Sequence, residues 1–244
     1  MRKIGKKGSH VEVILSFVIF VTFLVVLYTI VKPVIREPID KEYLLNHIKT
    51  DIISETSKTL IIQHINVISI GDQGCFVLQN YDYLSPHLSV KNETDSTKPV
   101  YTSEEGLLID SGDLGIYKIY YSDQFTNDLY PSLKVCDILT QEDGEYTVGD
   151  KKSLKYVFLG QMEGFAGNYT EEYSMVKDEI GIPEGVDFSF KFTNSDKNTI
   201  AAPTQPKQAP QSAEIYSEEL PVVYVDYSEK IKTGFLTVTV WSEQ

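Results

Sequence analysis

Two cysteines, two N-glycosylation acceptor sequences and four histidines are the residues whose types and spacing could do chemistry. Cys75 and Cys136 are sixty-one residues apart, and Cys75 begins the strand predicted at 75–79. Outside the cytoplasm they would either form a disulfide, which contributes about 4 kcal/mol in the chain-entropy model, or remain two buried thiols. The sequence leaves both alternatives open.

The sequences 92–94 (NET) and 168–170 (NYT) match the acceptor pattern for N-glycosylation. A glycan on Asn92 or Asn168 requires that this part of the chain be translocated, and chance matches to so short a pattern are common. Modification at either asparagine would therefore establish the topology.

The histidines show no spacing typical of metal ligands, and two cysteines cannot build a four-cysteine zinc site. No nucleotide-binding loop and no G-x-S-x-G nucleophile motif occurs in the sequence. We therefore expect no metal ion, no cofactor and no catalytic residue, and we do not expect an enzyme. The four histidines are His10, His47, His64 and His87.

Sixteen tyrosines are the remaining unusual feature. Six of them either line a recognition surface or pack half-buried in strands. The packing interpretation is the simpler one. These six are Tyr81, Tyr83, Tyr117, Tyr120, Tyr121 and Tyr130.

The chain has 244 residues, 42% of them hydrophobic and 23% charged, which is enough for one ordinary domain or two small ones. Its formal net charge of −13 argues against nucleic acid as a partner, because phosphate binding requires a basic surface.

An uncharged run of nineteen residues, Val13 to Val31, predicts a transmembrane helix of roughly 28 Å. The run is longer than the apolar part of a cleavable secretory signal and lacks a small-residue cleavage site after it. Four basic residues precede it and two follow, which places the N-terminus in the cytoplasm. Residues 37–244 hold 16 lysines, no arginine and 34 acidic residues, so we expect an acidic domain outside the cytoplasm.

A short basic leader, Gly8, Glu12 and the apolar run follow one another in this order along the chain. This arrangement resembles the class III signal of type IV pilin-like and archaellin-like precursors, and the SHVE start resembles uncharacterised archaeal membrane proteins with that signal. The resemblance covers about 35 residues. It implies that a prepilin-type peptidase cuts after Gly8, that Ser9 becomes the new N-terminus, and that Glu12 offsets the amino terminus of a neighbouring subunit.

Glu12 departs from the family pattern, because it is fourth after Gly8 whereas the family glutamate is fifth. Three alternatives follow: the cut falls after Lys7, the spacing is relaxed, or the leader is retained. Without processing, Glu12 is an interfacial acid favoured by the dipole at a helix N-terminus.

The rest of the chain predicts an α+β fold: a leader (1–8), a transmembrane helix (9–35), a kinked amphipathic helix or stalk (36–58) and a mainly antiparallel β-rich domain (59–244). Within that domain we expect a short helix at 171–180 and an exposed proline-rich loop at about 194–212. The predicted strands are 59–70, 75–79, 88–91, 106–110, 116–122, 154–159, 186–193, 221–227 and 235–241.

Together these features favour a membrane-anchored, pilin-like structural subunit or minor pilin of a surface filament. Its expected partners are the lipid bilayer, like subunits and a leader peptidase. The alternative is an uncleaved single-pass anchor that carries an extracytoplasmic binding module.

Overall fold

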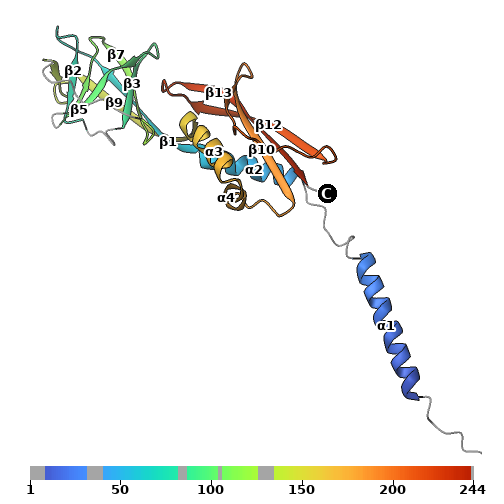
Figure 1. Cartoon of the computed structure of the whole chain (residues 1–244). Helices are drawn as coiled ribbons and strands as arrows, with labels where there is room; N and C mark the ends of the chain where they lie inside the picture. The colour runs from blue at the N-terminus through green and yellow to red at the C-terminus, as the bar shows by residue number, and fades with distance from the viewer. Residues whose placement is uncertain (1–8, 32–40, 82–86, 104–105, 126–134, 243–244) are drawn as a thin grey trace, which may run out of the picture. The chain divides into compact units, whose positions relative to one another are not determined.

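The computed structural model describes residues 9–31, 41–81, 87–103, 106–125 and 135–242. The chain divides into two compact units, Met1–Lys41 and Glu42–Gln244. Apart from Lys41, the described part of the first unit is one helix, α1 (Ser9–Val31). The second unit, which we call the head, combines three helices with a large, mostly antiparallel sheet (Figure 1). The predicted α+β class is confirmed, whereas the predicted kink falls in residues 32–40, outside the described residues.

α1 forms in a stretch that contains neither proline nor glycine, and its 23 residues make a helix of roughly 35 Å. The side chains described along it are exposed on every side. A soluble helix normally buries one apolar stripe, so a helix that is apolar all round requires a non-aqueous environment or a partner.

The first helix of the head, α2 (Lys41–Thr56), runs directly into β1 (Ser57–Val67). Leu44, Ile48 and Ile52 recur every four residues and are buried, as expected for one face of a helix. Tyr43, one residue before Leu44, is 70% exposed. The helix predicted as a stalk therefore contributes to the core of the head, and it ends at Thr56 because the chain continues as a strand.

Nine strands form one sheet in the order β11-β10-β13-β12-β9-β1-β7-β3-β4, and a second sheet has the order β5-β6-β2-β8. Two neighbouring pairs, β2–β8 and β9–β12, are parallel, and the other pairs are antiparallel. Besides β1, the strands are β2 (Phe76–Gln79), β3 (Leu88–Asn92), β4 (Thr97–Lys98), β5 (Val100–Ser103), β6 (Gly106–Ile109), β7 (Gly115–Tyr121), β8 (Asp137–Leu139), β9 (Tyr146–Phe158), β10 (Val186–Asn194), β11 (Thr199–Ala201), β12 (Ile215–Val225) and β13 (Ile231–Ser242).

The helical lobe of the head consists of β10–β13 with α2, α3 (Leu159–Glu171) and α4 (Tyr173–Glu179). Alternation along β10 and β13 turns their apolar side chains toward these helices, which confirms the strands predicted at 186–193 and 235–241. Apolar side chains are removed from water where the helices meet the sheet, and this burial stabilises the lobe. Its core includes Ile48, Ile52, Met162, Tyr169, Phe188, Phe192, Leu236 and Val238.

The sandwich lobe packs strands β9, β1, β7, β3 and β4 of the large sheet against the four-stranded sheet. Side chains from the facing sides of both sheets fill the space between them. Its core includes Ile65, Phe76, Leu78, Leu107, Ile109, Tyr117 and Ile119.

The two lobes share the large sheet, but the connection within it is narrow. β9 pairs with β12 only through Tyr224 with Val157 and Val225 with Phe158. β9 pairs with β1 along most of its length, and in Figure 1 these two strands extend away from α3 toward the sandwich lobe. Beyond the two pairs, the facing edges of β9 and β12 have no strand partner among the described residues.

The structure departs from the predicted elements in three places. α3 occupies residues 159–171, of which only Leu159 was in a predicted strand and Glu171 in the predicted helix. Its glycines lower helix propensity, but its buried side chains, such as Met162 and Tyr169, stabilise the helix through packing. β9 and β12 each begin well before the predicted strands. The exposed first halves of both strands lack an alternation of buried and exposed residues, so no pattern indicated them. The loop predicted at 194–212 is interrupted by β11, which pairs with β10.

Candidate functional site

α1 is long and apolar enough to cross a membrane over residues 12–29, and it is the one such helix among the described residues. Its polar hydroxyls are satisfied within the helix. Thr22 donates hydrogen bonds of 2.9 Å to the carbonyls of Val18 and Ile19, and Thr29 donates one of 2.8 Å to that of Val26. These bonds lower the cost of placing threonine in lipid, where no water is present to hydrogen-bond its hydroxyl.

The residues predicted to take part in leader processing lie at the start of this helix. Ser9 is its first residue, and Glu12 lies in its first turn with an exposed side chain. A carboxylate there interacts favourably with the partial positive charge of the helix N-terminus. Gly8, after which the cut is predicted, lies outside the described residues.

The structure joins Cys75 and Cys136 in a disulfide, with a Cα–Cα separation of 5.0 Å. Cys75 is buried immediately before β2, and Cys136 immediately precedes β8. The backbone N–H of Asp137 also donates a 3.0 Å hydrogen bond to the carbonyl of Cys75. The bridge therefore fixes the short β8 beside β2 in the smaller sheet, where three residue pairs form the parallel ladder.

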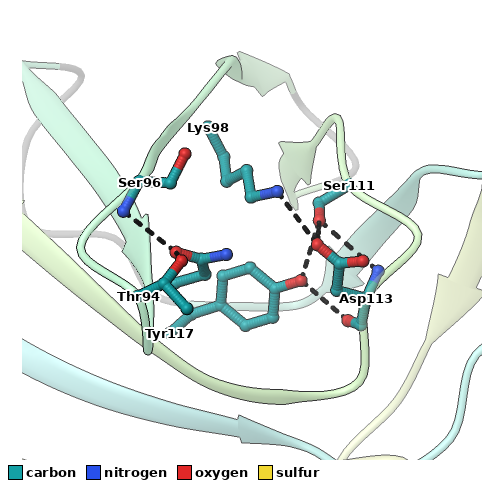
Figure 2. Close-up of polar contacts among 7 residues, drawn as sticks. Thr94, Ser96, Lys98, Ser111, Asp113 and Tyr117 are labelled. Atoms are coloured by element: carbon teal, nitrogen blue, oxygen red, sulfur yellow. Dashed lines mark hydrogen bonds and ion pairs between the residues drawn. The ribbon is translucent and has the colours of Figure 1, made fainter.

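The two predicted glycosylation acceptors lie in different local structures. Asn92 is the last residue of β3, at the start of the turn that leads to β4. Thr94 and Ser96, drawn in Figure 2, belong to this turn. Asn168 lies on α3, in the helical lobe. The structure does not bring the two asparagines into one site.

The histidines of the head do not form a cluster. His47 Nδ1 lies 3.4 Å from Asp51 on α2, His87 Nδ1 lies 3.0 Å from the carbonyl of Phe125, and His64 is on β1. Among the described residues, no group of three or more histidine, cysteine, aspartate or glutamate side chains is placed to hold a metal ion.

Four of the six tyrosines considered for a recognition surface are buried in the head core. Tyr81 and Tyr121 share a 2.6 Å hydrogen bond between their hydroxyls, and Tyr81 also donates to Gln63. Tyr117 and Tyr120 are buried as well. Their role is packing, in agreement with the simpler interpretation, while Tyr83 and Tyr130 lie outside the described residues.

A largely buried polar cluster lies where the two lobes meet, and the sequence pattern did not indicate it. Lys91 on β3 is 1% exposed, and its Nζ donates a 2.6 Å hydrogen bond to the backbone carbonyl of Glu229. Ser89, two residues earlier, donates to the carboxylate of the same Glu229. The ammonium also lies 5.2 Å from the centre of the Tyr120 ring. We call these four residues the junction cluster.

Glu229 is held in place by the turn between β12 and β13. The carboxylate of Asp226 accepts hydrogen bonds of 2.9 Å from the backbone N–H groups of Ser228 and Lys230, and it forms an ion pair with Lys232. Glu229 itself has a φ of 60°, in the left-handed region that non-glycine residues rarely adopt. The turn therefore presents both the carbonyl and the carboxylate of Glu229 to the sandwich lobe.

Burial lowers the pKa of Lys91 from its usual value, and the nearby carboxylates of Asp95 and Glu229 act in the opposite direction. The ammonium of Lys91 bonds to the carbonyl of Glu229 in the β12–β13 turn, and it lies 3.9 Å from the carboxylate of Asp95 in the turn between β3 and β4. The junction cluster therefore holds the two lobes together by hydrogen bonds between β3 and the β12–β13 turn.

Two grooves flank the connection between the lobes. One, of about 360 Å³, lies between the open edges of β9 and β12 and is lined mainly by apolar groups, including Leu154, Val157, Pro221 and Val223. The other, of about 240 Å³, lies beside the β12–β13 turn. The larger groove is suited to covering an apolar group of a partner.

Comparison with models of protein families, with curated proteins and with solved structures gives no match. No relative therefore contributes a function or a residue role, and the following proposals depend on the residues and geometry described above.

Proposed function

We propose that this chain is a membrane-anchored, pilin-like structural subunit, or a minor pilin, of a surface filament. The observation that carries the proposal is α1, a helix that is uncharged from Val13 to Val31, has apolar side chains exposed on all sides and is attached to a separate folded head. Such a helix is stable in lipid, and its apolar side chains are also suited to packing against the apolar helices of like subunits. In this proposal α1 packs laterally through valine, isoleucine, leucine and phenylalanine, while the head faces outward.

The proposed orientation has the basic leader in the cytoplasm and the acidic head outside the cell membrane. The positive-inside rule supports this direction, with four basic residues before the helix and two directly after it. The disulfide between Cys75 and Cys136 agrees with it, because disulfides persist in oxidising compartments.

Sequencing the N-terminus of the protein purified from membranes tests the proposal. A start at Ser9 corresponds to a cut after Gly8, a start at Gly8 to a cut after Lys7, and an intact Met1 to an uncleaved anchor. In cells that contain the leader peptidase, Gly8→Leu should leave the full precursor mass. Gly5→Leu is the matched control in the same leader and should be processed normally.

An intact N-terminus in the wild-type protein, together with no oligomer after crosslinking in the membrane, would contradict the filament proposal. That outcome favours the second candidate, a single-pass anchor that carries a binding module. The specific observation behind it is the apolar groove between β9 and β12, which offers an uncovered surface to a partner.

A further inference from the structure

We propose that Asn92 is an N-glycosylation site of the folded head and that Asn168 is not, although both match the acceptor pattern. This inference rests on the proposed extracytoplasmic position of the head. It depends on how the fold holds the two three-residue acceptor sequences, which we call the turn acceptor (92–94) and the helix acceptor (168–170).

The turn acceptor lies at the surface. Asn92 is partly exposed, and residues 93–97 after it are exposed. The Oδ1 atom of Asn92 accepts two hydrogen bonds, one of 2.9 Å from the hydroxyl of Thr94 and one of 3.0 Å from the backbone N–H of Ser96 (Figure 2). These bonds use the oxygen of the amide, and among the described residues no hydrogen bond engages its nitrogen.

The turn itself is tight, and its backbone hydrogen bonds close within residues 92–96. Asp95, with a φ of 58°, donates its backbone N–H to the carbonyl of Asn92, and the N–H of Asn92 bonds to the carbonyl of Ser96. The middle residue of the acceptor, Glu93, is exposed, and its carboxylate accepts a 3.2 Å hydrogen bond at the surface from the backbone N–H of Ile116. An enzyme can therefore approach the Asn92 amide and the Thr94 hydroxyl from solvent without displacing the core.

The helix acceptor is tied into the head at all three residues. Asn168 has an exposed side chain, but its carbonyl accepts a 2.8 Å hydrogen bond from the backbone N–H of Glu172. Tyr169 is 1% exposed and donates its hydroxyl to the carbonyl of Phe188. The hydroxyl of Thr170 donates to the carbonyl of Ala166.

A transferase that recognises both the asparagine amide and the hydroxyl two residues later must take up the three residues together. For the helix acceptor this would require unwinding α3 and withdrawing Tyr169 from the core, where it packs against Phe188 and Phe190. For the turn acceptor the hydroxyl already lies beside the amide. The folded head therefore selects Asn92.

The transferred group would be a glycan whose anomeric carbon is bonded to the phosphate oxygen of a polyprenyl phosphate or diphosphate in the membrane. The Nδ2 atom of Asn92 attacks that carbon, forming the C–N bond, while the bond from carbon to phosphate oxygen breaks. The lipid phosphate leaves with the electron pair, and one Nδ2 proton passes to a base of the transferase. The carbonyl oxygen of the side chain is retained.

The test is mass spectrometry of tryptic peptides from the full-length protein, purified from the membranes of its native host. The turn acceptor falls in peptide 92–118 and the helix acceptor in peptide 156–177. We expect a glycan on the first peptide and none on the second. Asn92→Gln and Thr94→Ala should each reduce the intact mass to that of the bare polypeptide, while Thr94→Ser should retain the glycan. Asn168→Gln and Thr170→Ala are the matched controls and should leave the modification unchanged.

A glycan on peptide 156–177, or an unmodified peptide 92–118, overturns the inference. Protease added to intact cells separates this failure from that of the proposed function. If the protease digests the head and peptide 92–118 is bare, only the glycosylation inference is wrong. If the head is protected from the protease as well, the proposed topology also fails.

Discussion

Lys91 on β3 donates a 2.6 Å hydrogen bond to the backbone carbonyl of Glu229, which lies 138 residues further along the chain. This contact joins the sandwich lobe to the turn between β12 and β13 of the helical lobe. The sheet itself connects the lobes through only two pairs of residues between β9 and β12. The junction cluster therefore joins the two lobes in addition to the sheet, and its Tyr120 also belongs to a buried apolar cluster that contains Phe158 and Val225.

Removing the Lys91 side chain should destabilise the head. We expect Lys91→Ala to lower the free energy of unfolding by about 2–4 kcal/mol, since it leaves a cavity and the Glu229 groups without their buried partner. Lys91→Met preserves most of the volume and should cost about half as much. Urea unfolding of the full chain in detergent measures both. The control is Lys118→Met, directly opposite on β7 and less buried, which should change stability by about 0.5 kcal/mol or less. Equal effects of Lys91→Ala and Lys118→Met would contradict the role of the junction cluster.

Tyr169 should make the head less stable in alkali. Burial raises the pKa of Tyr169 to about 12, so between pH 10 and 12 the unfolded chain loses this proton while the folded head keeps it. The folded state then binds more protons than the unfolded state, and stability falls as pH rises, by at most about 1.4 kcal/mol per pH unit for this residue.

Unfolding curves recorded at several alkaline pH values test this dependence. Tyr169→Phe should reduce the steepness of the decline, although it also removes the hydrogen bond to Phe188 and lowers stability at neutral pH by about 1 kcal/mol. Tyr43→Phe, at an exposed position on α2, is the control and should leave the decline unchanged. A wild-type decline that Tyr169→Phe does not alter would show that other groups cause it.

Reduction of the disulfide between Cys75 and Cys136 should destabilise the sandwich lobe. The bridge closes a loop of 61 residues, and the chain-entropy model gives about 4 kcal/mol for such a loop. We expect a loss of about 2–4 kcal/mol in the double variant Cys75→Ser, Cys136→Ser, measured by urea unfolding. Alkylation of the unfolded wild-type protein without reductant should add no mass, because both sulfurs are bonded. Two alkyl groups added under these conditions would contradict the disulfide.

Side chains of α2 should matter to the stability of the head. Ile48 is fully buried in the core of the helical lobe, so Ile48→Ala should cost about 2–4 kcal/mol. Tyr43→Ala, on the same helix but 70% exposed, should change stability by about 0.5 kcal/mol or less. Thermal unfolding of the full chain in detergent compares the two. If α2 were a free stalk, the two variants would be equally mild.

Local patterns in the sequence are sufficient to predict an element when its two faces meet different environments, or when the whole element lies in a different environment from the rest of the chain. The uncharged run at 13–31 predicts α1 because charge is excluded from an apolar medium regardless of any tertiary contact. Alternation at 186–193 predicts β10 because one face of that strand meets the helices and the other does not.

Local patterns fail where burial depends on distant residues. In β3, Leu88 and Val90 alternate with Ser89 and Lys91, which places the lysine on a solvent face. The β12–β13 turn covers that face, so Lys91 is buried by a segment more than a hundred residues away. Prediction of the exposed half of β9 fails for the opposite reason. This half has no buried face, and its pairing with β1 determines that it is a strand.

The amino-acid sequence by itself determines that this protein has an apolar helix near its start, an acidic remainder and an α+β composition of elements, because these follow from side-chain transfer and short-range periodicity. Only the tertiary structure decides that Cys75 meets Cys136, that Lys91 joins the lobes, and that Asn92 lies in an open turn while Asn168 lies on a packed helix. Each of these depends on which distant surfaces exclude water from a residue, and that information is absent from its neighbours along the chain.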